Sequence, residues 1–212
     1  MGRDKGWLVP LTGVVFLVVV IVGFTISGEP PDPKDDSAQK IVDFYVDNKS
    51  SLMAGSFLEG LAALLLVFFG AYLREVLRVA AGGKDFLSTA AFAGLLLIAV
   101  GFTVDGSINL ALAETAEDID PAGVQALTAL FHNDFIPFAA GSVIFLIATG
   151  ISVLQQGVLP KWIGWIAILL AVIGFTPIGY VAFIGSGILI AIIGVVLAIR
   201  GRARPATPAV TS

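Results

Sequence analysis

The sequence predicts an all-α integral membrane protein with six transmembrane helices. Its 212 residues are 57% hydrophobic and only 13% charged, whereas soluble domains are about 45–50% apolar and about 25% charged. The mean hydropathy is +0.96. Six long apolar runs follow one another along the chain, and each approaches the ~20 residues that a helix needs to cross a bilayer. We therefore expect residues 1–200 to form a single six-span membrane domain.

The same composition excludes several classes of protein. A chain this apolar is not a cytosolic enzyme, and its net charge of −4 argues against a nucleic-acid binder. The sequence contains no cysteine, which excludes a disulfide scaffold, a thiolate metal site and a cysteine nucleophile. The expected partners are the lipid bilayer and either other membrane proteins or further copies of this chain.

The first three spans are expected at residues 7–27, 52–73 and 86–109. The first apolar run is longer than the ~7–15 residues of a signal-peptide core, so we interpret it as an uncleaved anchor. Pro10 lies in the first turn of this span, where a missing backbone N–H is harmless.

The last three spans are expected at residues 124–154, 162–178 and 180–199. Pro137 lies within the first of these and cannot donate a backbone hydrogen bond. It is predicted to kink that helix and to direct the side chains just before it into the bundle. The tail, residues 201–212, combines prolines with small polar residues and is predicted to be disordered.

The basic residues predict that both termini lie in the cytoplasm, because Lys and Arg favour cytoplasmic loops. Six spans with the N-terminus inside place nine basic residues on the inner side and three on the outer side. The three outer residues are Lys34, Lys40 and Lys49. This topology also places all three tryptophans at the inner interface, where an indole ring is well accommodated.

The segment 29–51 is expected to be an acidic external loop that carries a short amphipathic helix. Ser37 can cap this helix, and Ile41, Phe44 and Tyr45 then share one face at i, i+3 and i+4. One interpretation is a lid or a helix that docks a partner. The other is a helix that lies on the outer membrane surface or on the bundle.

A repeated string, GFTxxG, closes each odd-numbered span at its outer end and predicts three helical hairpins, at residues 6–80, 84–158 and 160–201. The repeated glycines and threonines are Gly23, Thr25, Gly101, Thr103, Gly174 and Thr176. Gly141-Ser142 and Gly185-Ser186 recur with an offset of 44 residues. Parallel repeats about an axis along the membrane normal are common in transporters. The alternative is that these small residues only permit close helix packing.

Six polar residues near the outer ends of the spans form a candidate polar cluster. They are Glu59, Asp105, Asn109, His132, Asn133 and Asp134. We expect Glu59, Asp105 and either His132 or Asp134 to converge between the second, third and fourth spans, because ionisable groups within spans are often functional. Three interpretations remain: groups wetted at headgroup level, a vestibule for a solute or cation, and a metal or hydrolytic site.

No specific chemistry is indicated by the spacing of these residues. One histidine with three carboxylates lacks the spacing of the known metal motifs, and no GxSxG or P-loop string is present. We therefore assign no catalytic, cofactor-binding or metal-binding residue and no cofactor.

From Phe131 onward, a Gly-rich fourth span is followed by a short polar turn and by LPKWIGW, residues 159–165, at the start of the fifth span. In these features the chain resembles a group of small, uncharacterised six-helix bacterial membrane proteins. The segment GEPPDPKDDSAQKIVDFYVDN resembles their first loop. The resemblance implies six helices and a location in the bacterial inner membrane, but no activity and no site residues.

The expected function is that of a multi-pass inner-membrane protein with a non-enzymatic structural or accessory role. The first alternative is a small transporter or channel with an outward-facing polar vestibule. The second is a metal-assisted intramembrane enzyme.

Overall fold

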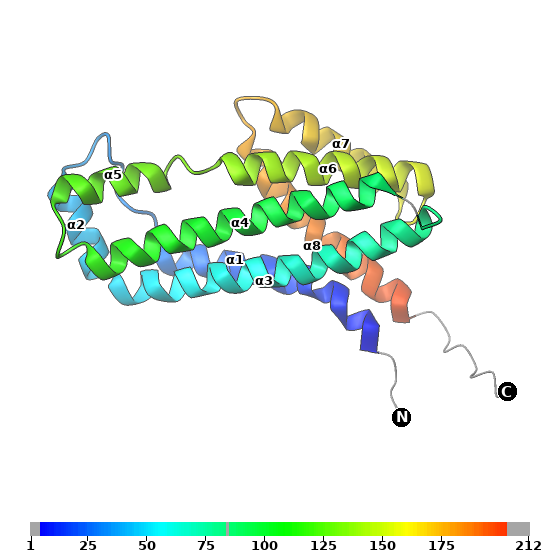
Figure 1. The fold of residues 1–212 in the computed structure, drawn as a ribbon, viewed down its shortest axis with the longest axis horizontal. Helices are drawn as coiled ribbons and strands as arrows, with labels where there is room; N and C mark the ends of the chain where they lie inside the picture. Colours follow the sequence, from blue (N-terminus) through cyan, green and yellow to red (C-terminus); the bar gives the residue numbers. More distant parts are fainter. Residues whose placement is uncertain (1–4, 84, 203–212) are drawn as a thin grey trace.

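The computed structural model describes residues 5–83 and 85–202, and within these ranges it is all-helical, with 83% helix and no strand (Figure 1). The elements in chain order are η1 (Lys5–Leu11), α1 (Thr12–Ser27), α2 (Ala38–Asp47), α3 (Lys49–Ala80), α4 (Phe86–Thr115), α5 (Pro121–Phe131), α6 (Ile136–Gln156), α7 (Lys161–Gly174) and α8 (Tyr180–Arg202). The predicted all-helical class is therefore confirmed. Residues 203–212 of the tail that the sequence predicts to be disordered lie outside the described residues, and Gly201 and Arg202 belong to α8.

Five helical segments are long and apolar enough to cross a membrane. They are Gly6–Ser27, Lys49–Ala80, Phe86–Thr115, Pro121–Gln156 and Tyr180–Gly201. The sixth expected span corresponds to α7, which is apolar but has only 14 residues. At about 1.5 Å per residue it is ~21 Å long, shorter than the ~30 Å hydrocarbon core. Six spans therefore remain a prediction.

Helix α7 ends at Gly174, four residues before the end of the expected span at 178. The chain turns there through short-range hydrogen bonds, from the N–H of Phe175 to the carbonyl of Val172 and from the N–H of Thr176 to that of Ile173. Pro177 follows, and a proline disfavours helical geometry in the residue before it. The GFTP string thus ends the helix at its first glycine.

The long helices form a closed ring in which each contacts its neighbours in chain order: α1, α3, α4, α6, α7 and α8, with α8 returning to α1. Figure 1 shows α3, α4 and α6 side by side along the long axis of the molecule. Helix α6 also contacts α8, where the hydroxyl oxygens of Ser142 and Ser186 are 3.3 Å apart. These two serines are equivalent in the predicted repeat, so one pair of equivalent positions meets inside the bundle.

The expected fourth span is divided into two helices. Helix α5 ends at Phe131 and α6 begins at Ile136, with a turn over residues 132–135 between them. The predicted kink at Pro137 is thus a break. Its physical reason is that Pro137 lies in the first turn of α6, where its lack of an N–H removes no helical hydrogen bond.

Helices α2 and α5 pack together over the ends of α3 and α4 and form a small separate unit that we call the cap. Its core is built around Ile41 and Tyr45, both fully buried, together with Leu52, Leu112 and Val124. Ser37 caps α2 as expected, since its hydroxyl accepts a hydrogen bond from the N–H of Lys40 at 3.3 Å. The structure shows that α2 lies on the bundle, while a role as a lid or as a helix that docks a partner stays a prediction.

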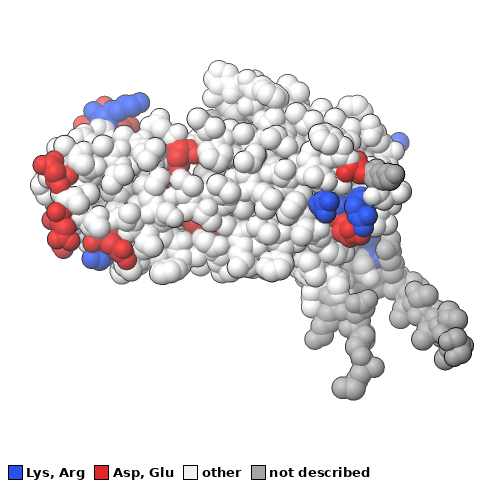
Figure 2. Space-filling view, viewed as in Figure 1, with Lys and Arg blue, Asp and Glu red and all other residues white. Residues whose placement is uncertain are grey.

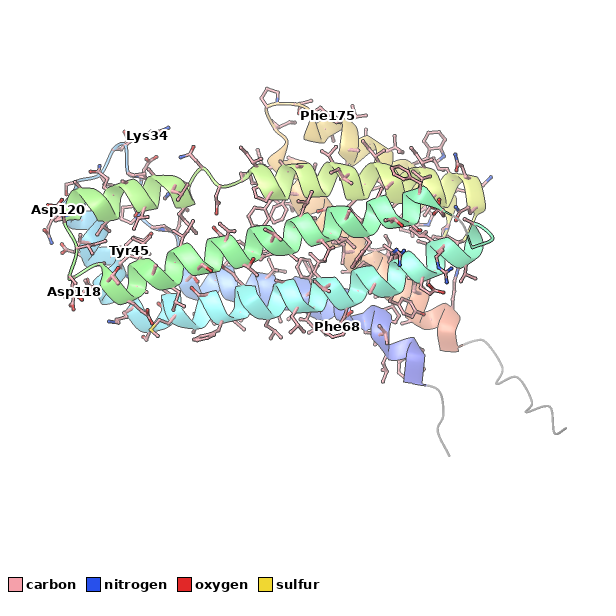
Figure 3. The ribbon with its side chains drawn as sticks, viewed as in Figure 1. Lys34, Tyr45, Phe68, Asp118, Asp120 and Phe175 are labelled. Atoms are coloured by element: carbon pink, nitrogen blue, oxygen red, sulfur yellow. The ribbon has the colours of Figure 1, made fainter. Side chains whose placement is uncertain are left out.

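The cap is tied down by contacts between segments distant in the sequence. The amide of Gln125 on α5 donates to the carbonyl of Pro33 at 2.7 Å, and the hydroxyls of Thr128 and Tyr45 are 3.4 Å apart. Figure 3 shows Tyr45 within the cap, with Asp118 and Asp120 at its tip and Lys34 on the loop above it. The cap lies at one end of the molecule, and the start of η1 and the end of α8 lie toward the other (Figure 1).

Candidate functional site

Three carboxyl groups from three different segments converge at the base of the cap. Glu59 comes from α3, Asp105 from α4 and Asp134 from the turn between α5 and α6, and each lies within electrostatic reach of the other two. Glu59 and Asp105 are only 4% and 5% exposed, whereas Asp134 is half-buried. We call these three residues the carboxyl cluster. It faces the protein interior and communicates with the surface through Asp134.

Helix length places the cluster about one hydrocarbon thickness from the opposite end of the bundle. Glu59 lies 21 residues from the end of α3 at Ala80, and Asp105 lies 19 residues from the start of α4 at Phe86. At about 1.5 Å per residue both are ~30 Å from the opposite end of the bundle, one hydrocarbon thickness away. Asp134 lies two residues before α6, at the same level. The cluster therefore separates the cap from the membrane-embedded part.

A glycine on α4 makes room for the carboxyl group of Glu59. A methyl group built on Gly106 would lie 2.8 Å from Oε2 of Glu59 and 3.2 Å from the carbonyl oxygen of Ser56. Any side chain at this position would therefore displace Glu59. Sequence reasoning did not single out Gly106 as a site residue, although it is the last glycine of the second GFTxxG string.

Among the described residues, no cationic side chain forms an ion pair with the cluster. In residues 5–83 and 85–202, the ion pairs are Lys40 with Asp36 and Arg78 with Glu75, both away from it. Oε2 of Glu59 and Oδ2 of Asp134 are buried without a hydrogen-bond partner. An unpaired buried carboxylate is energetically expensive, so such a group is neutralised by a proton or by a cation.

The carboxyl groups of Asp105 and Asp134 lie within hydrogen-bonding reach of each other. An ionised carboxylate only accepts hydrogen bonds, whereas a protonated one can also donate. A hydrogen bond between the two groups therefore requires a proton on one of them. Asn109, one turn beyond Asp105 on the same face of α4, is 3% exposed and also has an unpartnered amide oxygen.

His132 and Asn133 do not join the cluster. Both are exposed, and both bond to the last turn of α5: Nδ1 of His132 lies 2.9 Å from the carbonyl oxygen of Thr128, and the amide of Asn133 donates to that of Ala129 at 2.7 Å. They terminate α5, and only Asp134 turns inward. Of the two residues expected to complete the cluster, the structure brings in Asp134.

The repeated glycines and threonines play different structural parts. Each glycine contacts the helix that follows it in its expected hairpin, and the contacts are Gly23 with Leu58, Gly101 with Phe138, and Gly174 with Ala182. Each threonine is exposed and donates to a carbonyl three or four residues earlier in the chain at 2.6–2.8 Å, as found for Thr25, Thr103 and Thr176. The glycines thus permit close packing, and the threonines satisfy their hydroxyls locally.

Aromatic side chains close the bundle beneath the cluster. Phe102, one turn from Asp105, packs edge-on against Phe138 with ring centroids 5.1 Å apart, and Phe138 packs against Phe183 at 4.9 Å. Below them the hydrophobic core continues mainly with leucine, isoleucine, alanine and phenylalanine side chains. These aromatic rings lie between the cluster and the hydrophobic core toward the opposite end of the bundle.

The surface of the cap is acidic. Figure 2 shows mostly red side chains and a few blue ones over the cap, whereas blue and red side chains lie together at the opposite end of the molecule. Ten acidic residues and three lysines occupy the loops and helices of 29–51 and 114–120.

Within the described ranges, no three His, Asp or Glu side chains are arranged to hold a metal ion. No family model, no curated protein and no solved structure matches this chain.

Proposed function

We propose that this chain is a non-enzymatic membrane protein whose cap responds to the protonation of the carboxyl cluster. The observation that carries the proposal is the burial of Glu59 and Asp105 beside Asp134 without a cationic side chain in contact. The cap then serves as the surface presented to other membrane proteins. This is the structural or accessory role that the sequence favours, and in the proposal it is controlled by the protonation of the carboxyl cluster.

The topology is part of the proposal. With six spans, including the short α7, both termini lie in the cytoplasm and the acidic cap lies outside. The basic residues at the end opposite the cap support this orientation. The three consecutive hairpins of the ring support the repeat, and LPKWIGW supports membership of the six-helix bacterial group and an inner-membrane location.

The proposed switch follows from charge repulsion at the base of the cap. When the shared proton is bound, Asp105 and Asp134 hold the α5–α6 turn against α4. When it is lost, two or three like charges face one another in a poorly solvated space, which is unfavourable. The break at 132–135 gives α5 freedom to move away from α6, and α2 moves with α5 because the two share one core.

Hydrogen–deuterium exchange of the full-length protein in lipid nanodiscs tests the proposal. After correction for intrinsic exchange, α2 and α5 should be more protected at about pH 5 than at about pH 9. The double variant Glu59→Gln, Asp105→Asn should lose this difference. Asp118→Asn, an exposed acid at the tip of the cap, should retain it. Equal protection of the wild-type cap at both pH values would refute the proposal.

A small proton-coupled transporter is the second candidate, and the broken α5–α6 helix favours it. Discontinuous helices commonly form the ion sites of secondary transporters. The aromatic closure beneath the cluster requires that such a protein rearrange to complete transport. Proteoliposomes with an imposed pH gradient distinguish the two candidates. Proton flux through the wild-type protein that disappears in Asp134→Asn supports transport, and the absence of proton flux through the wild-type protein supports the first proposal.

A further inference from the structure

A groove opens between α3 and α8 at the end opposite the cap. Its volume is about 370 Å³, and its walls include Tyr72, Val76 and Val79 of α3, Leu197 and Arg200 of α8, and Val158 from the connection between α6 and α7. The walls are mostly apolar, and among the described lining residues the cationic side chain is Arg200. The groove thus combines apolar walls with a charged rim.

The charge of the groove is positive. Arg200 donates a hydrogen bond to the carbonyl oxygen of Val158, which orients the guanidinium without neutralising it. Within the described residues no carboxylate forms an ion pair with Arg200. Glu75 also borders the groove, but Arg78 binds both of its carboxylate oxygens, at 2.8 and 3.0 Å. The groove therefore presents one uncompensated guanidinium.

The groove lies at the level of the lipid headgroups. Trp7 packs against Gly201 at the end of α8, and Trp162 and Trp165, which follow Val158 closely in the chain, are 48% and 65% exposed. Exposed tryptophans concentrate at the membrane–water interface. A ligand in this groove would thus have its polar part among the headgroups and its apolar part along α3 and α8.

We propose that the groove binds an anionic phospholipid, with the phosphate at Arg200 and part of one acyl chain along Val76, Val79 and Leu197. Charge complementarity selects an anionic headgroup, because basic pockets between transmembrane helices recognise such lipids. The apolar walls select a lipid over a free phosphate ion, which leaves those walls unfilled. This site is separate from the carboxyl cluster and does not depend on the role proposed for it.

Native mass spectrometry of the full-length protein tests the site. Protein released from nanodiscs containing equal amounts of phosphatidylglycerol and phosphatidylcholine should retain phosphatidylglycerol about fivefold more often, the preference expected from one guanidinium near the surface. Arg200→Gln should abolish the preference. Arg74→Gln is the matched control, since this arginine lies at the same end of α3 but bonds to Thr89 outside the groove.

Two further arms define the ligand. Val79→Trp, a large side chain at an exposed position in the groove wall, should reduce retention of both lipids. Inorganic phosphate in excess should leave retention unchanged if an acyl chain is held, and should displace the lipid if only the phosphate is recognised. Equal retention of both lipids by the wild-type protein, or an unchanged preference in Arg200→Gln, would overturn the proposal.

Discussion

Asp105 of α4 and Asp134 of the α5–α6 turn hold their carboxyl groups within hydrogen-bonding reach, although 29 positions separate them in the chain. The contact joins the membrane-embedded bundle to the only break in its long helices within the described residues. A hydrogen bond between the two groups requires a proton on one of them, so in the proposed switch a single bound proton stabilises the junction of cap and bundle.

Replacing Asp105 by asparagine should therefore alter the pH dependence of stability. In the proposed switch the folded protein holds a proton that the unfolded chain releases at neutral pH, so the folded state binds more protons and the free energy of unfolding falls as pH rises. The side-chain amide of asparagine can donate a hydrogen bond to Asp134 and has no titratable proton. At about pH 9 we expect Asp105→Asn to be more stable than the wild type by about 1–2 kcal/mol, and nearly equal to it at about pH 5.

Thermal unfolding in detergent at the two pH values measures this effect. Asp43→Asn is the control, because Asp43 is an exposed acid on α2. A variant Asp105→Asn that is less stable than the wild type at both pH values would show that the carboxyl pair is not a proton-sharing contact.

Helices α4 and α6 should tolerate no side chain at their closest approach. A methyl group built on Gly94 would lie 2.5 Å from the backbone nitrogen of Phe145 and 2.7 Å from the carbonyl oxygen of Gly141. Backbone atoms cannot rotate away, so Gly94→Ala should destabilise the bundle by about 1–3 kcal/mol. Gly60→Ala is the matched control: it also lies inside a long helix, but nothing lies within 4 Å. It should stabilise the protein by about 0.5–1 kcal/mol. Equal effects of both changes on the melting temperature would contradict this packing.

The cap should depend on the ring of Tyr45 more than on its hydroxyl. The side chain is fully buried, and burial raises the pKa of Tyr45 above its ordinary value of 10.0, so the phenol stays protonated under ordinary conditions. Tyr45→Ala should destabilise the cap by about 3–5 kcal/mol. Tyr45→Phe removes only the contact with Thr128 and should cost about 1 kcal/mol. Exchange rates of the α2 and α5 amides compare the two variants, and similar rates would show that the ring is not a core residue.

The membrane topology can be tested by labelling single introduced cysteines, because the protein has no cysteine of its own. Asp35 in the loop before α2 and Gln155 near the end of α6 are both exposed and lie at opposite ends of the bundle. In intact cells an impermeant maleimide should label Asp35→Cys and not Gln155→Cys, and both should react after lysis. The reverse pattern would invert the proposed topology.

The sequence predicted what depends on composition and on helical period. Long apolar runs locate the helices because crossing a bilayer demands them, and the i, i+3, i+4 spacing of Ile41, Phe44 and Tyr45 identifies the buried face of α2. The convergence of Glu59 and Asp105 follows from their similar distance along neighbouring antiparallel helices. These features depend on residues that are close in the sequence or at matching positions along two neighbouring helices.

The sequence did not predict what depends on packing between segments. A proline at position 137 is compatible with a kinked helix and with a new helix, and only the docking of α5 on α2 selects the second. The turn directs Asp134 inward and His132 outward. The two residues are only two positions apart, so the backbone conformation of the turn determines which of them faces the interior. The position of Glu59 against Gly106 depends on the register of α3 relative to α4. The residue pattern within one helix does not specify this register.

Infrared spectroscopy of the protein in lipid at about pH 7 tests the central claim most directly, because the C=O stretch of a protonated carboxylic acid is resolved from that of ionised carboxylates. Ordinary exposed acids are ionised at this pH, so a protonated band reports the cluster. We expect the band in the wild type, its loss or marked reduction in Asp105→Asn, and no change in Asp118→Asn. A wild-type spectrum without a carboxylic acid band, or a band that survives unchanged in Asp105→Asn, would contradict the claim that the cluster holds a proton.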